Sequence, residues 1–219
     1  ADAAWSLQVD DGGDFSVFDV VHLGKVVGTV EWSMMGGHNA ANALAAIAAA
    51  HHAGVPTGAA IEALTQFKGI RRRMELRGVA AGVKVYDDFA HHPTAIATTL
   101  DGLRRSVGAE RIVAVLEPRS ATMRLGVHRE TLAPSLELAD EVWLFAPPDL
   151  GWDAAAVVRG LGERGHLAND VESLVTSLAG RLRARDHVLI MSNGGFGGLH
   201  GKLLAALESR ETAAMRRRS

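Results

Sequence analysis

The 219-residue sequence contains no cysteine, which excludes disulfide bonds, thiolate zinc sites and a cysteine nucleophile. It has no apolar run of about 18 residues and no charged-then-apolar leader, so we expect a soluble chain. The absence of cysteine suits a reducing compartment and predicts a cytoplasmic protein. The sequence has a single tyrosine, so it has few side chains of the kind that stack on bases, which disfavours a nucleic-acid-binding surface.

Hydrophobic residues make up 47 % of the chain, enough to build a core. The net charge of −2 is unevenly distributed. Residues 1–65 hold seven acidic residues and one basic residue, whereas residues 66–219 hold eighteen acidic and twenty-two basic residues. This asymmetry predicts a domain boundary near residues 66–70. The mild positive excess of the second part favours small anionic ligands.

Short, partly β-branched runs at residues 5–9, 15–23 and 26–32 predict a small antiparallel meander. Two helices are expected after it, an alanine-rich one over 39–52 and a second over 57–67.

From residue 83 onward, strand patterns alternate with helix patterns. The expected strands are 83–87, 111–117, 141–146 and 187–191, and the expected helices are 93–105, 128–139, 153–163, 170–183 and 199–208. Such alternation predicts a doubly wound α/β domain with a mainly parallel sheet. We expect residues 209–219 to be frayed and solvated.

Polar residues follow three of the four predicted strands. In open α/β sheets, ligands bind beyond the carboxyl ends of the strands, so these positions are candidate site residues. They are Asp87, Asp88, His91 and His92 after the first strand, Glu117, Arg119 and Ser120 after the second, and Ser192, Asn193 and a glycine-rich turn after the last.

The segment DDFAHHPT (residues 87–94) has several interpretations. Pro93 suits the first position of a helix, and His92 or Thr94 could cap that helix. Asp and His are also metal ligands, but no second cluster with ligand spacing occurs, and we predict no metal site in this chain. The histidines could instead orient a polar substrate or a phosphate.

Asn39 and Asn42 lie three residues apart at the start of a predicted helix and therefore share one face. Their amides could contact a purine edge, or they could cap the helix. The three consecutive arginines at 71–73 form either an exposed patch or a clamp for a polyphosphate. The stretch GGFGG lacks the lysine and hydroxyl of a P-loop, so a tight turn explains its glycines equally well.

Five stretches occur in order over residues 36–207: GGHNAANALAAIAAA, FKGIRRRMELRG, VYDDFAHHPTAI, LEPRSATMRLGVH and MSNGGFGGLHGKLLAAL. Together they resemble the Mur ligase superfamily, and the last three are most similar to its tripeptide-adding branch. The resemblance implies that residues 1–67 are the C-terminal part of a central ATP-binding domain. It implies that residues 68–219 form a Rossmann-like C-terminal substrate-binding domain.

The resemblance also implies ATP-driven amide formation in peptidoglycan recycling. A muramyl carboxylate would attack the γ-phosphate of ATP, and the amine of a peptide would capture the acyl phosphate. The implied substrates are UDP-N-acetylmuramate and a murein tripeptide. The implied cofactors are ATP and Mg²⁺, with the magnesium ligands mostly outside this chain.

Three sets of site residues follow from the resemblance. The cofactor-binding set is His38, Asn39, Asn42, Arg73 and Asp88; the catalytic set is Arg73, Asp88, His91 and His92; the substrate-binding set is Arg119, Ser120, Thr122, Asn193, Gly194, Gly195 and Phe196. Arg73 is expected to clamp phosphate. Arg119 is expected to bind a carboxylate of the peptide.

Mur ligases also use a GxxGK(S/T) phosphate loop, a modified lysine and a UDP-sugar domain, and this sequence contains none of them. We therefore expect a fragment that needs the N-terminal and P-loop portions of the same enzyme and does not catalyse ligation alone. One alternative is a non-catalytic nucleotide- or peptide-binding module of the same fold. Another is a metal-dependent hydrolase that uses Asp87, Asp88, His91 and His92.

Overall fold

The computed structural model describes residues 4–148 and 150–216. The chain forms two compact units, each with its own sheet and core. The N-terminal unit comprises Ala1–Ile70 and Asp101–Gly108, and the C-terminal unit comprises Arg71–Leu100 and Ala109–Ser219.

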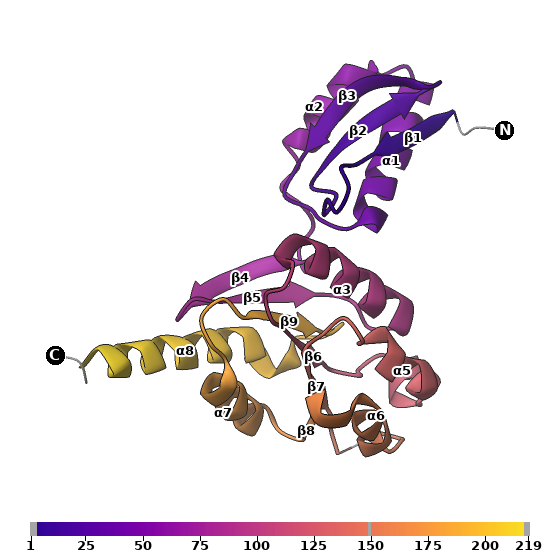
Figure 1. Ribbon diagram of the computed structural model, residues 1–219. Helices are drawn as coiled ribbons and strands as arrows, with labels where there is room; N and C mark the ends of the chain where they lie inside the picture. The colour runs from indigo at the N-terminus through magenta and orange to yellow at the C-terminus, as the bar shows by residue number, and fades with distance from the viewer. Residues whose placement is uncertain (1–3, 149, 217–219) are drawn as a thin grey trace. The chain divides into compact units, whose positions relative to one another are not determined.

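A three-stranded antiparallel sheet forms the centre of the N-terminal unit, in the order β1-β2-β3 (Figure 1). Its strands are β1 (Trp5–Gln8), β2 (Val17–His22) and β3 (Lys25–Glu31), and the helices α1 (Gly37–His52) and α2 (Thr57–Thr65) pack on it. The predicted meander and both predicted helices are confirmed. The core lies between the sheet and the helices, because strand residues such as Phe18 and Val30 cluster with Ile47 and Ile61.

The C-terminal unit contains a six-stranded sheet in the order β4-β5-β9-β6-β7-β8. Its strands are β4 (Glu75–Ala80), β5 (Val83–Asp88), β6 (Ile112–Leu116), β7 (Glu141–Phe145), β8 (Gly165–Ala168) and β9 (His187–Met191). Only β4 runs antiparallel to its neighbour, and the other pairs are parallel. The predicted mainly parallel α/β sheet is confirmed.

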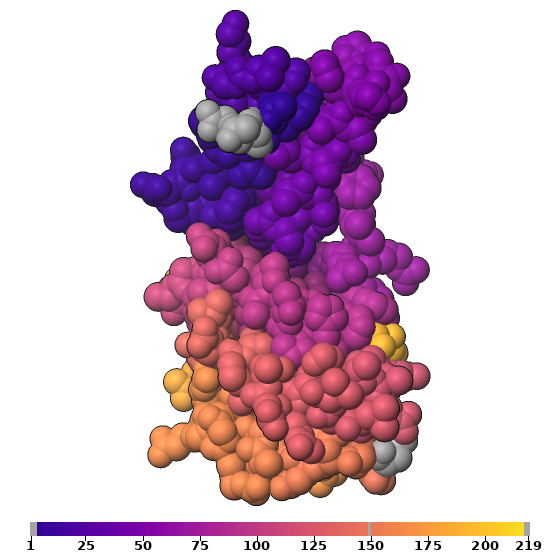
Figure 2. Space-filling view, turned by 90° about the vertical axis from the view of Figure 1, so that its right-hand side faces the viewer, coloured from indigo at the N-terminus to yellow at the C-terminus, as the bar shows by residue number. Residues whose placement is uncertain are grey.

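Helices cover both faces of this sheet, as Figure 1 shows. They are α3 (Pro93–Val107), α4 (Ala121–Arg124), α5 (Arg129–Ser135), α6 (Ala154–Leu161), α7 (Val171–Arg181) and α8 (Leu199–Arg216). Helices α7 and α8 lie on one face, where Leu178 and Leu203 pack against Val113 and Val188 of the strands. Helices α3, α5 and α6 lie on the other face, which is turned towards the viewer in Figure 2.

Two edge strands and the end of the last helix differ from the sequence prediction, which also lacks the short helix α4. The edge strands β4 and β8 were not predicted, because most of their residues are exposed or half-buried and carry no clear strand pattern. The prediction that residues 209–219 are frayed is wrong for 209–216, which continue α8. There Arg210 donates from Nη1 to the carbonyl oxygen of Leu182 at the end of α7, 2.7 Å away, which holds the helix in place. Residues 217–219 lie outside the described part.

Strand β9 lies between β5 and β6, so the carboxyl ends of these three strands are neighbours. The backbone N–H of Ser192 donates to the Asp88 carbonyl oxygen at 3.1 Å. The N–H of Glu117 donates to the Met191 carbonyl oxygen at 3.0 Å. The three polar strand ends therefore meet at one edge of the sheet, as the sequence predicts.

Candidate functional site

Asp88, at the end of β5, is only 2 % exposed and accepts hydrogen bonds from nearby backbone N–H groups. Its carboxylate oxygens accept hydrogen bonds from the N–H groups of Met74 (2.8 Å) and Ala90 (2.7 Å). Burial raises the pKa of Asp88 above its ordinary value, although these two amide donors act in the opposite direction. Asp88 therefore fixes the turn after β5, and its own oxygens have little capacity left for a ligand.

Asp87 lies between a guanidinium and an imidazole. Its Oδ2 is 3.3 Å from Nε of Arg72, and its Oδ1 is 3.3 Å from Nε2 of His200. Burial works to raise the pKa of Asp87, but His200 and Arg72 outweigh burial and hold that pKa below its ordinary value. Asp87 is therefore an ionised carboxylate at neutral pH. Sequence reasoning did not identify either of its partners.

Of the three consecutive arginines, Arg72 is the one whose guanidinium donates hydrogen bonds to the protein backbone. Its Nη2 donates to the carbonyl oxygens of Ser192 (2.5 Å) and Gly194 (2.7 Å), which ties the start of β4 to the turn after β9. Its guanidinium also lies 5.3 Å from the centre of the Phe89 ring. Sequence reasoning missed Arg72, since three adjacent arginines look alike in a sequence.

Arg73, the predicted phosphate clamp, is exposed. Its guanidinium lies 5.6 Å from the centre of the Phe89 ring and makes no ion pair within residues 4–148 and 150–216. A guanidinium supported by a ring but not neutralised by a carboxylate can bind an anion. The structure thus leaves Arg73 available for the predicted role and gives Arg72 a structural one.

His91 and His92 form an edge-to-face pair with ring centres 5.4 Å apart. Nδ1 of His91 lies 2.9 Å from the Phe89 carbonyl oxygen, whereas His92 is exposed and its Nδ1 lies 3.4 Å from the N–H nitrogen of Ala95. Burial lowers the pKa of His92, and the positive charges of His91, His128 and Arg73 lower it further. The pKa of His92 is therefore below that of an ordinary histidine.

His128 is a further residue that sequence reasoning missed. It precedes α5, and it is among the groups that lower the pKa of His92. The available signal was its position as the last residue of LEPRSATMRLGVH, one of the five stretches that carry the family resemblance.

Arg119 and Gly194 are brought together from the ends of β6 and β9. A Cβ atom added to Gly194 would lie only 2.6 Å from Cζ of Arg119, so the arginine side chain lies directly across the glycine. Arg119 is exposed, and within the described residues its guanidinium makes no ion pair or hydrogen bond. The glycine therefore leaves space for a guanidinium whose donors remain unused.

Ser120 and Thr122 flank Arg119 on the loop after β6. Ser120 caps the short helix α4, since its Oγ accepts a hydrogen bond from the N–H of Met123 at 3.4 Å. Oγ1 of Thr122 lies 3.4 Å from the same Oγ, and its residue is exposed. The two hydroxyls thus lie beside each other, next to Arg119.

The turn after β9 contains the remaining predicted substrate-binding residues. Oδ1 of Asn193 is buried and has no hydrogen-bond partner among the described residues. The side chain of Phe196 is 1 % exposed and packs edge-to-face on Phe145, with ring centres 5.2 Å apart. Phe196 is therefore a core residue, and only its backbone could reach a ligand. Gly194 and Gly195 contribute backbone alone.

His38, Asn39 and Asn42, the predicted adenine contacts, lie in the first turns of α1 in the N-terminal unit. Asn39 is 9 % exposed, and its Nδ2 donates to the Met35 carbonyl oxygen at 2.8 Å, so its amide serves the local backbone. His38 and Asn42 are exposed. The side chain of Asn42 makes no hydrogen bond within the described part of the chain and is the better candidate for a base contact.

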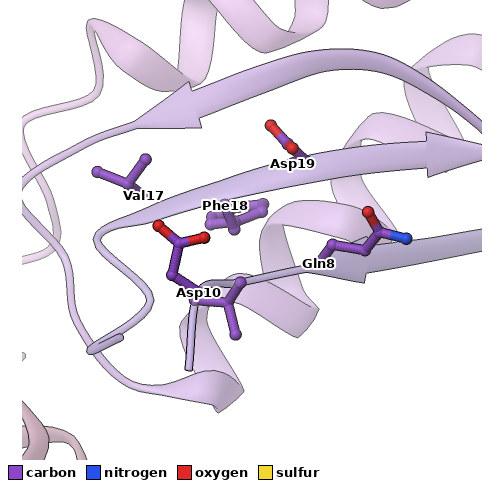
Figure 3. A pocket seen from close by; sticks show the side chains of 6 residues that line it. Gln8, Asp10, Val17, Phe18 and Asp19 are labelled. Atoms are coloured by element: carbon purple, nitrogen blue, oxygen red, sulfur yellow. The ribbon is translucent and has the colours of Figure 1, made fainter. Parts of the chain in front are cut away.

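A separate cavity of about 390 Å³ lies beside β1 and β2 of the N-terminal unit (Figure 3). It is lined by Gln8, Val9, Asp10, Val17, Phe18 and Asp19. No predicted site residue faces it. Asp19 already accepts a hydrogen bond from Oγ1 of Thr29 at 2.6 Å.

Within the described residues, no group of three or more histidine, aspartate or glutamate side chains could hold a metal ion. Asp87 is paired with Arg72, and Asp88 accepts hydrogen bonds from two backbone N–H groups. In the same part of the chain, no helix is long and apolar enough to cross a membrane.

Comparisons with known proteins give a consistent result. Residues 72–194 match the family described as Mur ligase, glutamate ligase domain. The chain is 50 % identical over 202 residues to UDP-N-acetylmuramate--L-alanyl-gamma-D-glutamyl-meso-2,6-diaminoheptandioate ligase of Escherichia coli K12, an alignment that covers 92 % of this chain and 44 % of the relative. It is 45 % identical over 196 residues to the Haemophilus influenzae protein of the same name, covering 89 % of this chain and 43 % of the relative. The chain thus spans less than half the length of these relatives.

Two solved structures are also similar. The murein peptide ligase of Psychrobacter arcticus aligns with a TM-score of 0.68 and 40 % identity, over 94 % of this chain and 44 % of that protein. The UDP-N-acetylmuramate-alanine ligase of Thermotoga maritima aligns with a TM-score of 0.79 over 94 % of this chain and 46 % of that protein. Its 24 % identity supports the fold alone.

Proposed function

The chain belongs to the Mur ligase family, and on this premise we propose that it is the C-terminal part of an ATP-dependent peptide ligase. The enzyme joins UDP-N-acetylmuramate to the tripeptide L-Ala-γ-D-Glu-meso-diaminopimelate in peptidoglycan recycling. The observation that carries this proposal is the 50 % identity, over 92 % of the chain, to a relative named for this ligation. In this scheme residues 1–67 end the ATP-binding domain, and residues 68–219 form the substrate-binding domain.

Arg119 is the proposed anchor for a carboxylate of the tripeptide. Its planar guanidinium can donate two parallel hydrogen bonds to a carboxylate, and no protein group uses those donors among the described residues. Oδ1 of Asn193 supplies a buried acceptor without a partner, which suits an N–H group of the peptide. Gly194 supports both roles, because any side chain there would displace Arg119.

His92 is the proposed acceptor of the proton that the attacking amine loses. Its lowered pKa keeps the imidazole neutral at physiological pH, so that it can take a proton. Arg73 is exposed and has no ion pair among the described residues, and its positive charge would stabilise negative charge that develops during phosphoryl transfer. When bound, ATP supplies the phosphoryl group that activates the muramyl carboxylate.

Residues for the cofactor are only partly present. In the N-terminal unit, the exposed His38 and Asn42 fit the adenine base, whereas Asn39 fits less well because its amide is bonded to Met35. The sequence contains no GxxGK(S/T) loop for the phosphates. Mg²⁺ would be held mostly by residues outside this chain, and the chain alone is expected to be inactive.

A release assay for ADP tests the proposal. We would compare this chain with the product of its complete reading frame, in the presence of ATP and with each of the two substrates omitted in turn. Only the complete protein is expected to release ADP, and only with both substrates present. Substrate-dependent ADP release from the isolated chain would contradict its assignment as an inactive fragment. ADP release from the complete protein at the same rate with and without the tripeptide would contradict the assigned reaction.

A non-catalytic nucleotide- or peptide-binding module is the second candidate, which the lack of a GxxGK(S/T) loop in these 219 residues would permit. The upstream reading frame separates the two. A ligase requires GxxGK(S/T) before residue 1, whereas a binding module does not.

A further inference from the structure

The loop after β6 carries Arg119, Ser120 and Thr122, the proposed peptide contacts, and continues into the single turn of α4. A helix of four residues has too few internal hydrogen bonds to be stable alone. The two large apolar side chains that follow it bury little surface, since Leu125 is 75 % exposed and Val127 is 64 % exposed. The position of this loop therefore depends on contacts with other segments of the chain.

The segment after β7 supplies such contacts at the carboxyl end of α4. Nε1 of Trp152 donates a hydrogen bond to the Met123 carbonyl oxygen at 2.6 Å, and the N–H of Gly151 donates to the Arg124 carbonyl oxygen at 3.1 Å. The last carbonyl groups of a helix have no donor within that helix. Trp152 and Gly151 thus provide two donors that α4 cannot provide for itself.

The ring of Trp152 also lies directly against Gly126, in the turn that follows α4. A Cβ atom added to Gly126 would lie 2.9 Å from both Cγ and Cδ1 of Trp152, closer than side-chain carbons approach one another. Gly126 has a φ of +72°, which also favours glycine. Because Gly126 has no side chain, the indole can lie across the turn.

Trp152 is itself held by the start of α6. The next residue, Asp153, is the N-cap of this helix, and its Oδ1 accepts a hydrogen bond from the N–H of Ala155 at 2.9 Å. Helix α6 packs on β7 and β8 and buries Ala154 and Val157. The indole is therefore connected through α6 to the central sheet.

We propose that Trp152 is a positioning residue for the tripeptide: it holds α4 and thereby keeps Arg119, Ser120 and Thr122 in place for binding. This role rests on the proposed function, which puts the tripeptide beside these three residues. A loop that must be ordered when its ligand binds costs affinity, so a loop that is already held binds more tightly. Trp152 acts on peptide binding through the loop and not by contact with the peptide.

Amide hydrogen exchange in the 219-residue chain tests the first step, the hold on α4. Trp152→Phe keeps an aromatic ring beside Gly126 but removes the N–H donor. The amides of Arg124 and Leu125 donate to the carbonyl oxygens of Ser120 (2.8 Å) and Ala121 (3.0 Å). We expect both amides to exchange about fivefold faster in the variant, the effect of one net hydrogen bond, with the amides of β7 unchanged.

Trp32→Phe is the matched control for exchange. Trp32 lies in the N-terminal unit, and its Nε1 likewise donates to a backbone carbonyl oxygen, that of Phe15, at 3.1 Å. This substitution should leave exchange in α4 unchanged. Equal exchange of the α4 amides in Trp152→Phe and in the unchanged chain would overturn the hold on α4, as would equal acceleration by both substitutions.

Steady-state kinetics of the complete ligase test the second step, the effect on the tripeptide. Trp152→Phe should raise the KM for the tripeptide about fivefold, with kcat and the KM for ATP changed less than about twofold. Gly126→Ala, which pushes the indole away, should act in the same direction, whereas Gly24→Ala should not. Gly24 has a comparable φ of +75°, but a Cβ there meets no atom within 4 Å.

The kinetic outcomes separate this role from the proposed function. An unchanged KM for the tripeptide in Trp152→Phe, or an equal loss in every kinetic constant, would overturn the positioning role. If Arg119→Ala raises that KM while Trp152→Phe does not, only the role of Trp152 fails. If neither substitution changes it, the assignment of the tripeptide site fails as well.

Discussion

The two edges of the six-stranded sheet use charged residues in different ways. At the amino edge, Arg111 bonds to Asp186 at 2.7 Å and also to Glu141. Beside it, Nε2 of His187 lies 2.6 Å from a carboxylate oxygen of Glu110. These charges at the amino edge are paired with one another.

At the carboxyl edge, the charges fall into two groups. Arg72 and Asp87 are paired, whereas Arg73 and Arg119 are exposed and have no ion pair within the described residues. Paired charges satisfy each other and stabilise the fold. We propose that the unpaired guanidinium groups keep their donors for a ligand. Pairing thus distinguishes the charges that stabilise the fold from the charges that are candidates for binding.

The largest expected effect is on stability at the amino edge. Arg111→Met would leave the buried carboxylates of Glu141 and Asp186 without their cation, at a cost of about 3 kcal/mol in the free energy of unfolding. Urea denaturation measures this loss. The control is Arg159→Met, which breaks an exposed pair with Asp153 and should cost less than about 1 kcal/mol. Equal losses for the two variants would contradict the structural role of the amino edge.

The second effect distinguishes neighbouring arginines at the carboxyl edge. Arg72→Ala removes the donor to the carbonyl oxygens of Ser192 and Gly194 and the cation beside Oδ2 of Asp87, and should cost about 2 kcal/mol. Arg73→Ala removes no such bond and should change stability by less than about 0.5 kcal/mol. Thermal and urea unfolding of both variants check this difference. If Arg73→Ala proved the more destabilising, the assignment of roles would be wrong.

The third expected effect is on substrate binding, with the stability of the fold unchanged. Gly194→Ala would push Arg119 aside and should raise the KM for the tripeptide about tenfold in the complete ligase, equivalent to about 1.4 kcal/mol. Gly180→Ala is the control, because a Cβ at that glycine in α7 meets no atom within 4 Å. Steady-state kinetics with varied tripeptide measure the change. An unchanged KM in Gly194→Ala would separate Arg119 from peptide binding.

The smallest effect is a pH dependence at the amino edge. Hydrogen bonds from His187 and then Arg185 lower the pKa of Glu110 to about 2. A carboxyl group with a lowered folded-state pKa contributes stability above its unfolded pKa, and this contribution is lost as the pH falls towards about 2. The stability difference between the unchanged chain and Glu110→Gln should therefore be constant above about pH 5 and shrink below about pH 4. Urea unfolding at a series of pH values measures it, and a difference independent of pH would contradict the pairing.

The sequence predicts the central strands well, because β6, β7 and β9 are runs of five buried residues between turn signals. The edge strands β4 and β8 were missed, since an edge strand is partly exposed and needs no continuous apolar run. The meeting of three polar strand ends also follows from the sequence, because the topology of parallel sheets places their carboxyl ends together.

The roles of individual side chains were less predictable. Which of three adjacent arginines bonds to the turn after β9 depends on the backbone at Arg72, whose φ is +59°, and on carbonyl groups about 120 residues away along the chain. Asn39 does not cap α1, whose N-cap is Gly36 without a side-chain hydrogen bond; instead its amide donates to a carbonyl oxygen four residues earlier. Phe196 lies in a glycine-rich turn that suggests a pocket, yet packing against Phe145 buries it. The outcomes at Arg72 and Phe196 depend on tertiary contacts, which local sequence patterns do not contain.

The central claim is that the unpaired guanidinium groups at the carboxyl edge bind substrate, and Arg119→Ala in the complete ligase tests it most directly. The measurement is the KM for the tripeptide and the KM for ATP under the same conditions. We expect the KM for the tripeptide to rise between about tenfold and a hundredfold, the loss of a charge-assisted hydrogen bond, with the KM for ATP changed less than about twofold. An unchanged KM for the tripeptide, or an equal rise in both constants, would contradict the account.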